Sequence, residues 1–466
     1  MPDLTASRRT LLTGAVATAI TAAVVPWNDA AAARHSRVPN WRRNRELRPT
    51  RDHRDGVKRL ALPNGFQYRT FHHAGDQLDD GTTIPGFHDG MGAFAGSRPN
   101  TTILVRNHEV GGTPGAFGPV EVAYDPVGGG GTITIEVDRH GKVISDRVSL
   151  NGTSVNCNGG PTPWRTWLSG EETVQGPDVP LPGGAAGGTR PHGYIFEVPV
   201  DGASDRRPIR SAGRFAHEAA VVDPSTGFVY LTEDSLAAGF YRYRAPADPF
   251  QAGRLLDGGQ LEALAIVGQP GADLSGHFAN GTTFETTWVP IAEPDPTFAP
   301  GTTFDAATAA VSQQGALVGA AKFFFLEGAA WGNGKVWFVS TGGGTPADPY
   351  PVGRGQIWVY EPATARLEMF YESPDVDVMF LPDNIAIAPS GALVVCEDGL
   401  APNHLLAVSL DGEVSPLASI EAPANASDEW AGPSFSRDGH TLFVNVLGPA
   451  GFSAAIWGPW RQSGVG

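Results

Sequence analysis

The feature that most constrains the fold of this chain is a short segment that recurs six times along the sequence. Each copy begins at a glycine or a turn, continues as an apolar strand and ends in a polar residue, in most copies an acid or an amide. The copies span residues 103–109, 167–172, 229–234, 336–341, 393–398 and 442–445. Repetition of short strands in a fixed order is the sequence signature of a β-propeller. We therefore expect an all-β fold, a six-bladed β-propeller with long loops at the mouth of its channel.

Length and composition are compatible with that fold. A chain of 466 residues could hold two or three average domains, but one six-bladed propeller also fits this length. The 60 glycines and 39 prolines favour many short strands joined by turns over helices. We expect three parts, which are an export signal over residues 1–33, a basic linker over residues 34–59 and the propeller over residues 60–466.

The N-terminus carries an export signal. Ser7-Arg8-Arg9-Thr10-Leu11-Leu12 is a twin-arginine motif, an apolar run follows to Val25, and Ala31-Ala32-Ala33 offers small residues to a signal peptidase. The run is shorter than the roughly 20 residues that a membrane-spanning helix needs. We expect the twin-arginine export machinery as a partner, no membrane span after signal removal, and a location in the periplasm, at the cell wall or outside the cell.

The charge of the chain excludes one class of partner. The formal net charge is −16, although residues 34–59 are basic. The acidic part therefore lies in residues 60–466. Binding to nucleic acid requires a positive surface that neutralises phosphates. We expect no nucleic-acid partner.

Acidic residues recur at the strand ends that meet at one mouth of a propeller channel. In a blade, the innermost strand starts at one face and the next strand returns to that face. Crowded carboxylates repel one another unless cations neutralise them, and oxygen-rich groups suit calcium. The alternative is that individual acids lie in surface turns or bind backbone amides. The acids at these positions are Asp89, Glu109, Glu171, Glu172, Glu218, Glu233, Asp234, Glu327, Asp383, Glu397, Asp398 and Glu429.

Taken in order, these strand ends and their neighbours form a series of motifs that runs from about residue 60 to Trp460. The motifs are Leu62-Pro63-Asn64-Gly65-Phe66, His88-Asp89-Gly90-Met91, Arg106-Asn107-His108-Glu109, residues 156–164 running into 167–172, Gly213-Arg214-Phe215-Ala216-His217-Glu218, Leu326-Glu327-Gly328, Pro382-Asp383-Asn384 and Glu429-Trp430-Ala431-Gly432. This series resembles the PhoX family of alkaline phosphatases.

The resemblance implies a metal-dependent phosphoric-ester hydrolase that acts outside the cytoplasm on small phosphorylated substrates. It implies a cluster of calcium, alone or with iron, in the channel mouth, and no organic cofactor. Metals of this kind neutralise phosphoryl oxygens and activate a water. The implied catalytic residues are Glu218 and Glu327, and the implied substrate-binding residue is Arg214. The implied metal ligands are Asn107, Glu109, Glu171, Glu172, Glu218, Glu327, Asp383 and Glu429.

The chain departs from the family pattern at two positions. Gly170 stands where the family has a cysteine linked to iron binding, and glycine has no ligating side chain. Phe325 stands where the family has an arginine that would hold substrate phosphate. Cys157 could replace the missing ligand, although a plain core cysteine is the simpler interpretation. Cys157 and Cys396 are the two cysteines, and a disulfide between them is also open.

Two other functions fit part of the pattern. One is a catalytically weak propeller that binds calcium for structure and acts as a binding module. The other is a calcium-dependent lactonase-type hydrolase, because residues 382–385 followed by Gly391 are similar to the blade motif of that family. A phosphatase is expected to bring Arg214, Arg242 or Arg354 near the metals, whereas a lactonase would not need them.

Overall fold

The computed structural model describes residues 46–347, 352–399, 402–421, 428–463 and 465, so the expected export signal lies outside the described residues. The described chain is all-β in character, with strands gathered into five sheets. Three short helices accompany them, α4 (Phe304–Thr308), α5 (Ala310–Leu317) and α6 (Trp460–Ser463). The four 3-10 turns are η1 (Val120–Val122), η2 (Pro182–Gly184), η3 (Arg210–Ala212) and η4 (Arg254–Asp257).

Two of the sheets follow the chain order directly, and their neighbouring strands are antiparallel. The first has four strands, β4 (His88–Ala95), β5 (Thr101–His108), β6 (Gly130–Asp138) and β7 (Val143–Thr153). The second has three, β8 (Asn156–Pro161), β9 (Thr166–Glu171) and β10 (Ile195–Pro199).

The largest sheet has nine strands and consists of two antiparallel runs joined by one strand. The runs meet where β15 pairs with both β14 and β19. In spatial order the strands are β11 (His217–Val222), β12 (Val229–Glu233), β13 (Phe240–Arg244), β14 (Gln260–Ile266), β15 (Thr283–Pro290), β19 (Arg366–Glu372), β18 (Gln356–Glu361), β17 (Lys335–Ser340) and β16 (Leu326–Gly332).

The last two sheets combine strands from both ends of the chain. The six-stranded sheet contains β20 (Pro382–Ile387), β21 (Leu393–Glu397), β22 (His404–Val408), β23 (Val414–Ile420), β2 (Leu60–Leu62) and β1 (Arg48–Thr50). The four-stranded sheet contains β24 (Glu429–Phe435), β25 (Thr441–Leu447), β26 (Phe452–Trp457) and β3 (Gln67–Phe71). β26 pairs with β3, so the C-terminal strand and the N-terminal region lie in the same sheet.

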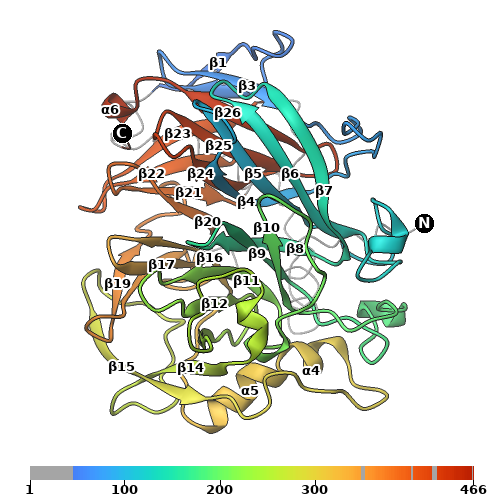
Figure 1. Ribbon diagram of the computed structural model, residues 1–466. Coiled ribbons are helices and arrows are strands. Elements are labelled where there is room, and N and C mark those ends of the chain that lie inside the picture. Colours follow the sequence, from blue (N-terminus) through green and yellow to red (C-terminus); the bar gives the residue numbers. More distant parts are fainter. Residues whose placement is uncertain (1–45, 348–351, 400–401, 422–427, 464, 466) are drawn as a thin grey trace.

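Six strands form a closed ring of contacts around the channel. β4 contacts β8, and the contacts continue through β11, β16, β20 and β24 back to β4. Figure 1 shows these inner strands near the middle of the molecule, with the other strands of each sheet outside them. The arrangement is propeller-like, and the next strand in each sheet runs antiparallel to its inner strand.

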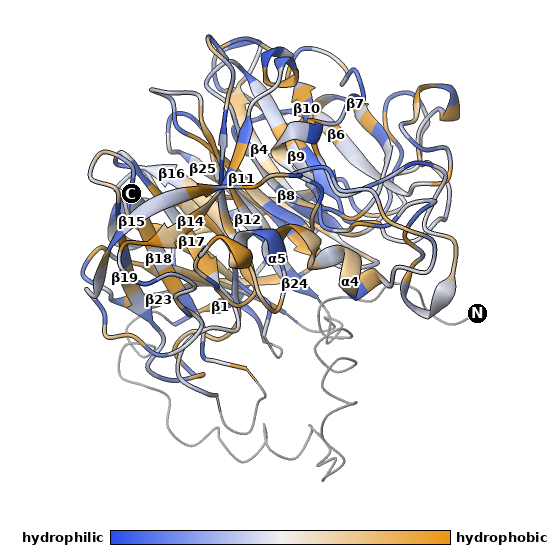
Figure 2. Cartoon of the chain, turned by 90° about the horizontal axis from the view of Figure 1, so that it is seen from below, coloured by the Kyte–Doolittle hydropathy of each residue, from blue (hydrophilic) through white to orange (hydrophobic). Residues whose placement is uncertain are grey.

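Hydrophobic cores fill the spaces between neighbouring sheets. Phe338 and Trp358 are fully buried, and both belong to the cluster that joins the two halves of the nine-stranded sheet. The Phe240 and Phe338 rings stack with centroids 4.3 Å apart. In Figure 2 hydrophobic residues gather on strands such as β14, β17 and β18. Burial of these aromatic side chains supplies much of the driving force for sheet packing.

Candidate metal centre

A β-bulge recurs at the start of five inner strands. In β4, His88 pairs with His108 and pairing resumes only at Met91 with Arg106, so two residues of β4 face one residue of β5. The same shift occurs in β8, β11, β16 and β20. Bulges redirect a side chain locally. The first bulged residue in each strand is Asp89, Cys157, Glu218, Glu327 or Asp383.

Four of these strands are entered through a residue in the left-handed backbone region. Non-glycine side chains rarely adopt this conformation, and it costs on the order of 1–3 kcal/mol where it occurs. The carbonyl of each such residue accepts a hydrogen bond from the backbone amide just beyond the end of the next strand. The backbone at the mouth is therefore fixed in a repeated, strained form. The four residues are Phe87 (φ 55°), Val155 (φ 47°), Phe325 (φ 47°) and Leu381 (φ 50°).

The bulges bring ligand atoms together in two groups that share one residue. The carboxylates of Glu218, Glu327 and Asp383 offer oxygens that all lie within 4.8 Å of one another. The Cys157 thiol and the Glu172 carboxylate form a second such group with Glu218. Glu218 and Glu327 are fully buried, and Asp383 is nearly so. Buried carboxylates at this spacing repel one another unless a cation or protons intervene, so the donor set fits a metal ion.

Asn384 connects the ligand groups, and sequence reasoning did not assign it to the site. Its amide nitrogen donates to Asp383 Oδ1 at 3.0 Å and to Glu218 Oε1 at 3.4 Å. Its oxygen accepts from the Gly432 backbone amide at 2.8 Å. The side chain is fully buried. The only sequence signal was its position directly after Asp383 in a recurring strand start.

A different set of acids, which close the second strand of a sheet, binds loop backbone instead. Glu233 accepts hydrogen bonds from the Gly239 amide and the Tyr241 hydroxyl. Glu397 accepts from the amides of Phe380 and His404. For Glu233 and Glu397, the alternative expected from the sequence, that individual acids bind backbone amides, is correct. Burial raises the pKa of Glu233 from 4.5 to about 7.

Glu171 also belongs to this bracing set rather than to the ligand groups. Its carboxylate accepts from the backbone amides of Ser154, Gly193 and Tyr194. It also contacts His192 Nδ1 at 2.6 Å. Burial alone would lower the pKa of His192, but Glu171 and Asp125 outweigh it and raise that pKa to about 9. With both carboxylate oxygens engaged in this way, Glu171 holds the loop before β10.

The Asn107 side chain holds strand β8 in place. Its nitrogen donates to the carbonyls of Cys157 and Asn158 at 3.0 and 2.9 Å. Its oxygen accepts from Trp167 Nε1 and Ser169 Oγ, each at 2.9 Å. Both polar atoms of this amide form hydrogen bonds. Asn107 was expected to be a metal ligand, but in the structure its side chain positions β8.

Arg214, the arginine expected to bind substrate, forms an ion pair with Asp178. Arg214 is almost fully buried and makes two hydrogen bonds to Asp178, at 2.7 and 2.9 Å. Arg242 pairs with Glu262, and Arg354 donates to the Pro374 carbonyl. The guanidinium of Arg214 therefore braces a loop, which corrects the expectation that it is presented to substrate.

The two remaining expected ligands, Glu109 and Glu429, are not members of the two groups. Glu429 on β24 is buried and Glu109 is half-buried beyond the end of β5. Within the described part of the chain, neither belongs to a set of converging ligand atoms. The bulge on β24 comes later than on the other inner strands, between Ala431 and Ser434, so Glu429 does not occupy the bulged position.

Both cysteines are free and buried, so they do not form the disulfide that the sequence left open. Cys157 lies in the channel with Glu172 and Glu218, whereas Cys396 lies in a hydrophobic cluster. Burial, with the negative charges of Asp383, Asp89 and Glu429, raises the pKa of Cys396 well above its ordinary value. Gly170 has no room for a side chain, since a Cβ there would lie 2.9 Å from the His217 carbonyl oxygen, and the backbone would have to shift to accept the cysteine of the family pattern.

Comparisons with known proteins agree with this architecture. A family model described as alkaline phosphatase PhoX matches residues 45–149 and 130–450. The solved structure of Pseudomonas fluorescens PhoX in complex with vanadate matches with a TM-score of 0.64 and 17% identity, covering 89% of this chain and 98% of that one. A gluconolactonase from Xanthomonas campestris matches with a TM-score of 0.42 and 13% identity, over 85% of this chain and 89% of that one. No curated protein matches the chain.

The family model spans nearly all of the described residues, and the solved PhoX structure has the same fold. The chain therefore belongs to the alkaline phosphatase PhoX family.

Proposed function

We propose that this protein is a metal-dependent phosphoric-ester hydrolase that acts on small phosphorylated substrates outside the cytoplasm. The observation that carries the proposal is the convergence of Cys157, Glu172, Glu218, Glu327 and Asp383 on one stretch of the channel in a member of the PhoX family. A catalytic site that stabilises phosphoryl transfer needs mainly positioned positive charge, and a set of buried anionic ligands can hold that charge as metal ions.

We propose further that the fold is a six-bladed propeller. The closed ring of six inner strands supports this count, although the strands group into five sheets. The nine-stranded sheet then corresponds to two blades, β11–β14 and β16–β19, which β15 links edge to edge.

The two ligand groups differ in the metals they favour. Glu218, Glu327 and Asp383 offer only oxygens, as calcium prefers. Cys157 adds a sulfur ligand to the other group, and thiolates favour transition metals such as iron or zinc over calcium. We propose calcium for the first group and a transition metal, iron in keeping with the family, for the second. When bound, such ions neutralise phosphoryl oxygens and lower the pKa of a water.

The surrounding residues orient the metal ligands and keep them buried away from water. Glu218 belongs to both groups, so its carboxylate could help to hold an ion in either group. Asn384 donates to Glu218 and Asp383, which fixes the direction of their remaining lone pairs. The sequence led us to expect Arg214, Arg242 or Arg354 beside the metals of a phosphatase, but all three bind other partners. In the proposed phosphatase, the positive charge that substrate phosphate requires therefore falls on the metals.

We propose export by the twin-arginine route on the basis of Arg8-Arg9 and the apolar run that follows. Within the described residues, no helix is long and apolar enough to cross a membrane.

The test is elemental analysis of the folded protein combined with hydrolysis of p-nitrophenyl phosphate. Glu218→Gln should lose metal from both groups, whereas Glu327→Gln should lose calcium and Cys157→Ser the transition metal. Hydrolysis should fall with the metal, because positive charge at the phosphoryl group is lost.

The matched controls are Glu233→Gln and Cys396→Ala, which change the same residue types in buried positions outside the ligand groups. Both should keep the full metal content. Wild-type metal content in Glu218→Gln would refute the assigned site. A protein with full metal content that does not hydrolyse phosphomonoesters would refute the proposed reaction.

A further inference from the structure

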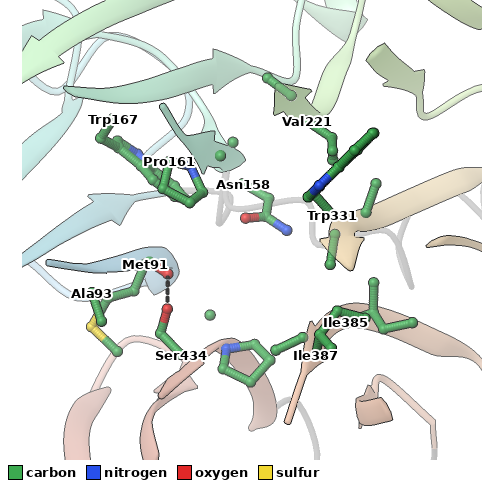
Figure 3. A pocket seen from close by; sticks show the side chains of 18 of the residues that line it. Met91, Ala93, Asn158, Pro161, Trp167, Val221, Trp331, Ile385, Ile387 and Ser434 are labelled. Atoms are coloured by element: carbon green, nitrogen blue, oxygen red, sulfur yellow. Dashed lines mark hydrogen bonds between the residues drawn. The ribbon is translucent and has the colours of Figure 1, made fainter. Parts of the chain in front are cut away.

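A cavity of about 260 Å³ lies in the channel below the bulges. The six inner strands line it, and its walls are mostly apolar (Figure 3). Several lining residues are only half-buried, so the cavity reaches solvent at the ends of these strands, away from the strand starts that carry the ligand groups. The large apolar side chains in the lining include Met91, Trp167, Trp331, Ile385, Ile387 and Phe435.

One polar side chain points into this cavity without a partner. Figure 3 shows Asn158 projecting from β8 toward the centre of the space. The residue is 7% exposed, and within the described chain its amide group makes no side-chain hydrogen bond. Its counterpart on β20, Asn384, uses both ends of its amide. The Ser434 hydroxyl, also in the cavity wall, already donates to the Met91 carbonyl.

The neighbouring strand leaves room for this amide. A Cβ on Gly90 would lie 2.5 Å from Asn158 Oδ1. Only glycine at that point of β4 permits the observed side-chain position. A ligand that fills the cavity hides this amide from water, which is unfavourable unless the ligand forms a hydrogen bond with it, so a ligand with one hydrogen-bonding end is favoured.

We propose that this cavity is a binding site for a slender, uncharged molecule with an apolar body and one hydrogen-bonding end, such as a short primary alcohol. The apolar body fits the walls, since an apolar cavity of roughly 150 Å³ already accepts benzene. The polar end pairs with Asn158. All described lining residues are uncharged, and burial of an unpaired ion there would be costly.

This site is separate from the metal centre. Cys157 is the first bulged residue of β8 and Asn158 the second, and the cavity extends from Asn158 toward the far end of the strand. The ligand enters from the face opposite the metal ligands and does not depend on the proposed hydrolysis.

The test is calorimetric titration of the metal-loaded protein with 1-hexanol, hexylammonium and hexanoate, with tryptophan emission as a second readout because Trp167 and Trp331 line the cavity. 1-Hexanol should bind, and the two ions should bind at least about tenfold more weakly. Failure of 1-hexanol to bind up to its solubility would overturn the proposal. If hexylammonium or hexanoate bound as tightly as 1-hexanol, the inference that the ligand is uncharged would be wrong.

Two kinds of variant locate the ligand. Asn158→Leu should lose about threefold to tenfold in affinity for 1-hexanol while keeping that for benzene, because it removes one hydrogen bond and leaves the walls apolar. Ala330→Phe and, independently, Ala93→Phe should fill the space and reduce binding of both probes. Unchanged melting temperatures identify variants that fold normally. If Ala330→Phe or Ala93→Phe folded normally and still bound 1-hexanol with wild-type affinity, the ligand would bind outside this cavity.

Discussion

At the scale of single residues, the acids of the channel mouth divide by the strand that carries them. Acids in the bulges of inner strands, such as Glu218, Glu327 and Asp383, turn toward one another. Acids that close the second strand, such as Glu171, Glu233 and Glu397, hold loop amides. The β-bulge thus distinguishes acids that join the ligand groups from acids that bind loop amides, although the two kinds look alike in the sequence.

Glu233 should make the stability of the fold depend on pH. Burial raises its pKa from 4.5 to about 7 in the folded state. A folded state that holds the proton more tightly gains stability at low pH, and this contribution is lost as the pH rises from about 4.5 through about 7. Glu233→Gln should therefore be more stable than the wild type at pH 8, by on the order of 3 kcal/mol, and similar at pH 4. Denaturant unfolding at both pH values measures the difference, and equal stabilities at pH 8 would contradict it.

Asn384 should tune metal affinity without binding metal. Asn384→Ala removes the hydrogen bonds to Glu218 and Asp383. Loss of such an orienting partner typically weakens metal binding about 10-fold to 100-fold. Calcium titration of the metal-stripped protein measures the effect. Ser434→Ala, which removes a channel hydrogen bond to the Met91 carbonyl, is the control and should keep wild-type affinity. Equal calcium affinities in the two variants would refute the orienting role.

At the scale of elements, the inner strands approach one another closely enough to demand small residues. A Cβ on Gly160 of β8 would collide with the backbone carbonyl of Ala220 on β11. Backbone atoms cannot move aside as a flexible side chain does. The width of the channel between these two strands is therefore set by glycine.

Gly160→Ala should destabilise the fold by about 3 kcal/mol or more, because one strand must shift. Gly276→Ala is the matched control, since nothing lies within 4 Å of its added Cβ. The control should change stability by less than about 0.5 kcal/mol. Thermal unfolding of both variants tests the contrast, and a Gly160→Ala protein as stable as the control would show that β8 and β11 can separate without cost.

At the scale of the whole molecule, the ring is closed by strands from opposite ends of the chain. β26 pairs with β3 from Ser453–Phe71 to Trp457–Gln67. The inner strands contact one another around the full circle, so each sheet depends on both neighbours.

A chain that lacks residues 452–466 should lose cooperative unfolding, because β3 and β25 would each lose a partner and the adjoining core would be exposed. A peptide of residues 452–466 added in trans should restore part of the transition. Calorimetry measures both effects. A truncated chain that melts like the full one would mean that ring closure contributes little to stability.

Patterns in the amino-acid sequence were enough to predict the all-β class, the order of the repeated strands and the family. Strand alternation, turn residues and the spacing of the acids are local features, and each copy repeats them. The sequence also indicated Glu218, Glu327 and Asp383, because each directly follows the start of an inner strand. These predictions needed only the position of a residue within its repeat.

Which polar side chains come into contact depends on the tertiary structure and could not be predicted from the sequence. Asn107, Glu171 and Arg214 carry the right chemistry, but contacts with distant residues such as Trp167, His192 and Asp178 engage them elsewhere. Asn384 joins the site through a carboxylate on another strand, and Asn158 faces a cavity built by six strands. Such contacts join residues far apart in the chain, and a register shift of one residue at a bulge decides them, so spacing in the sequence does not encode them.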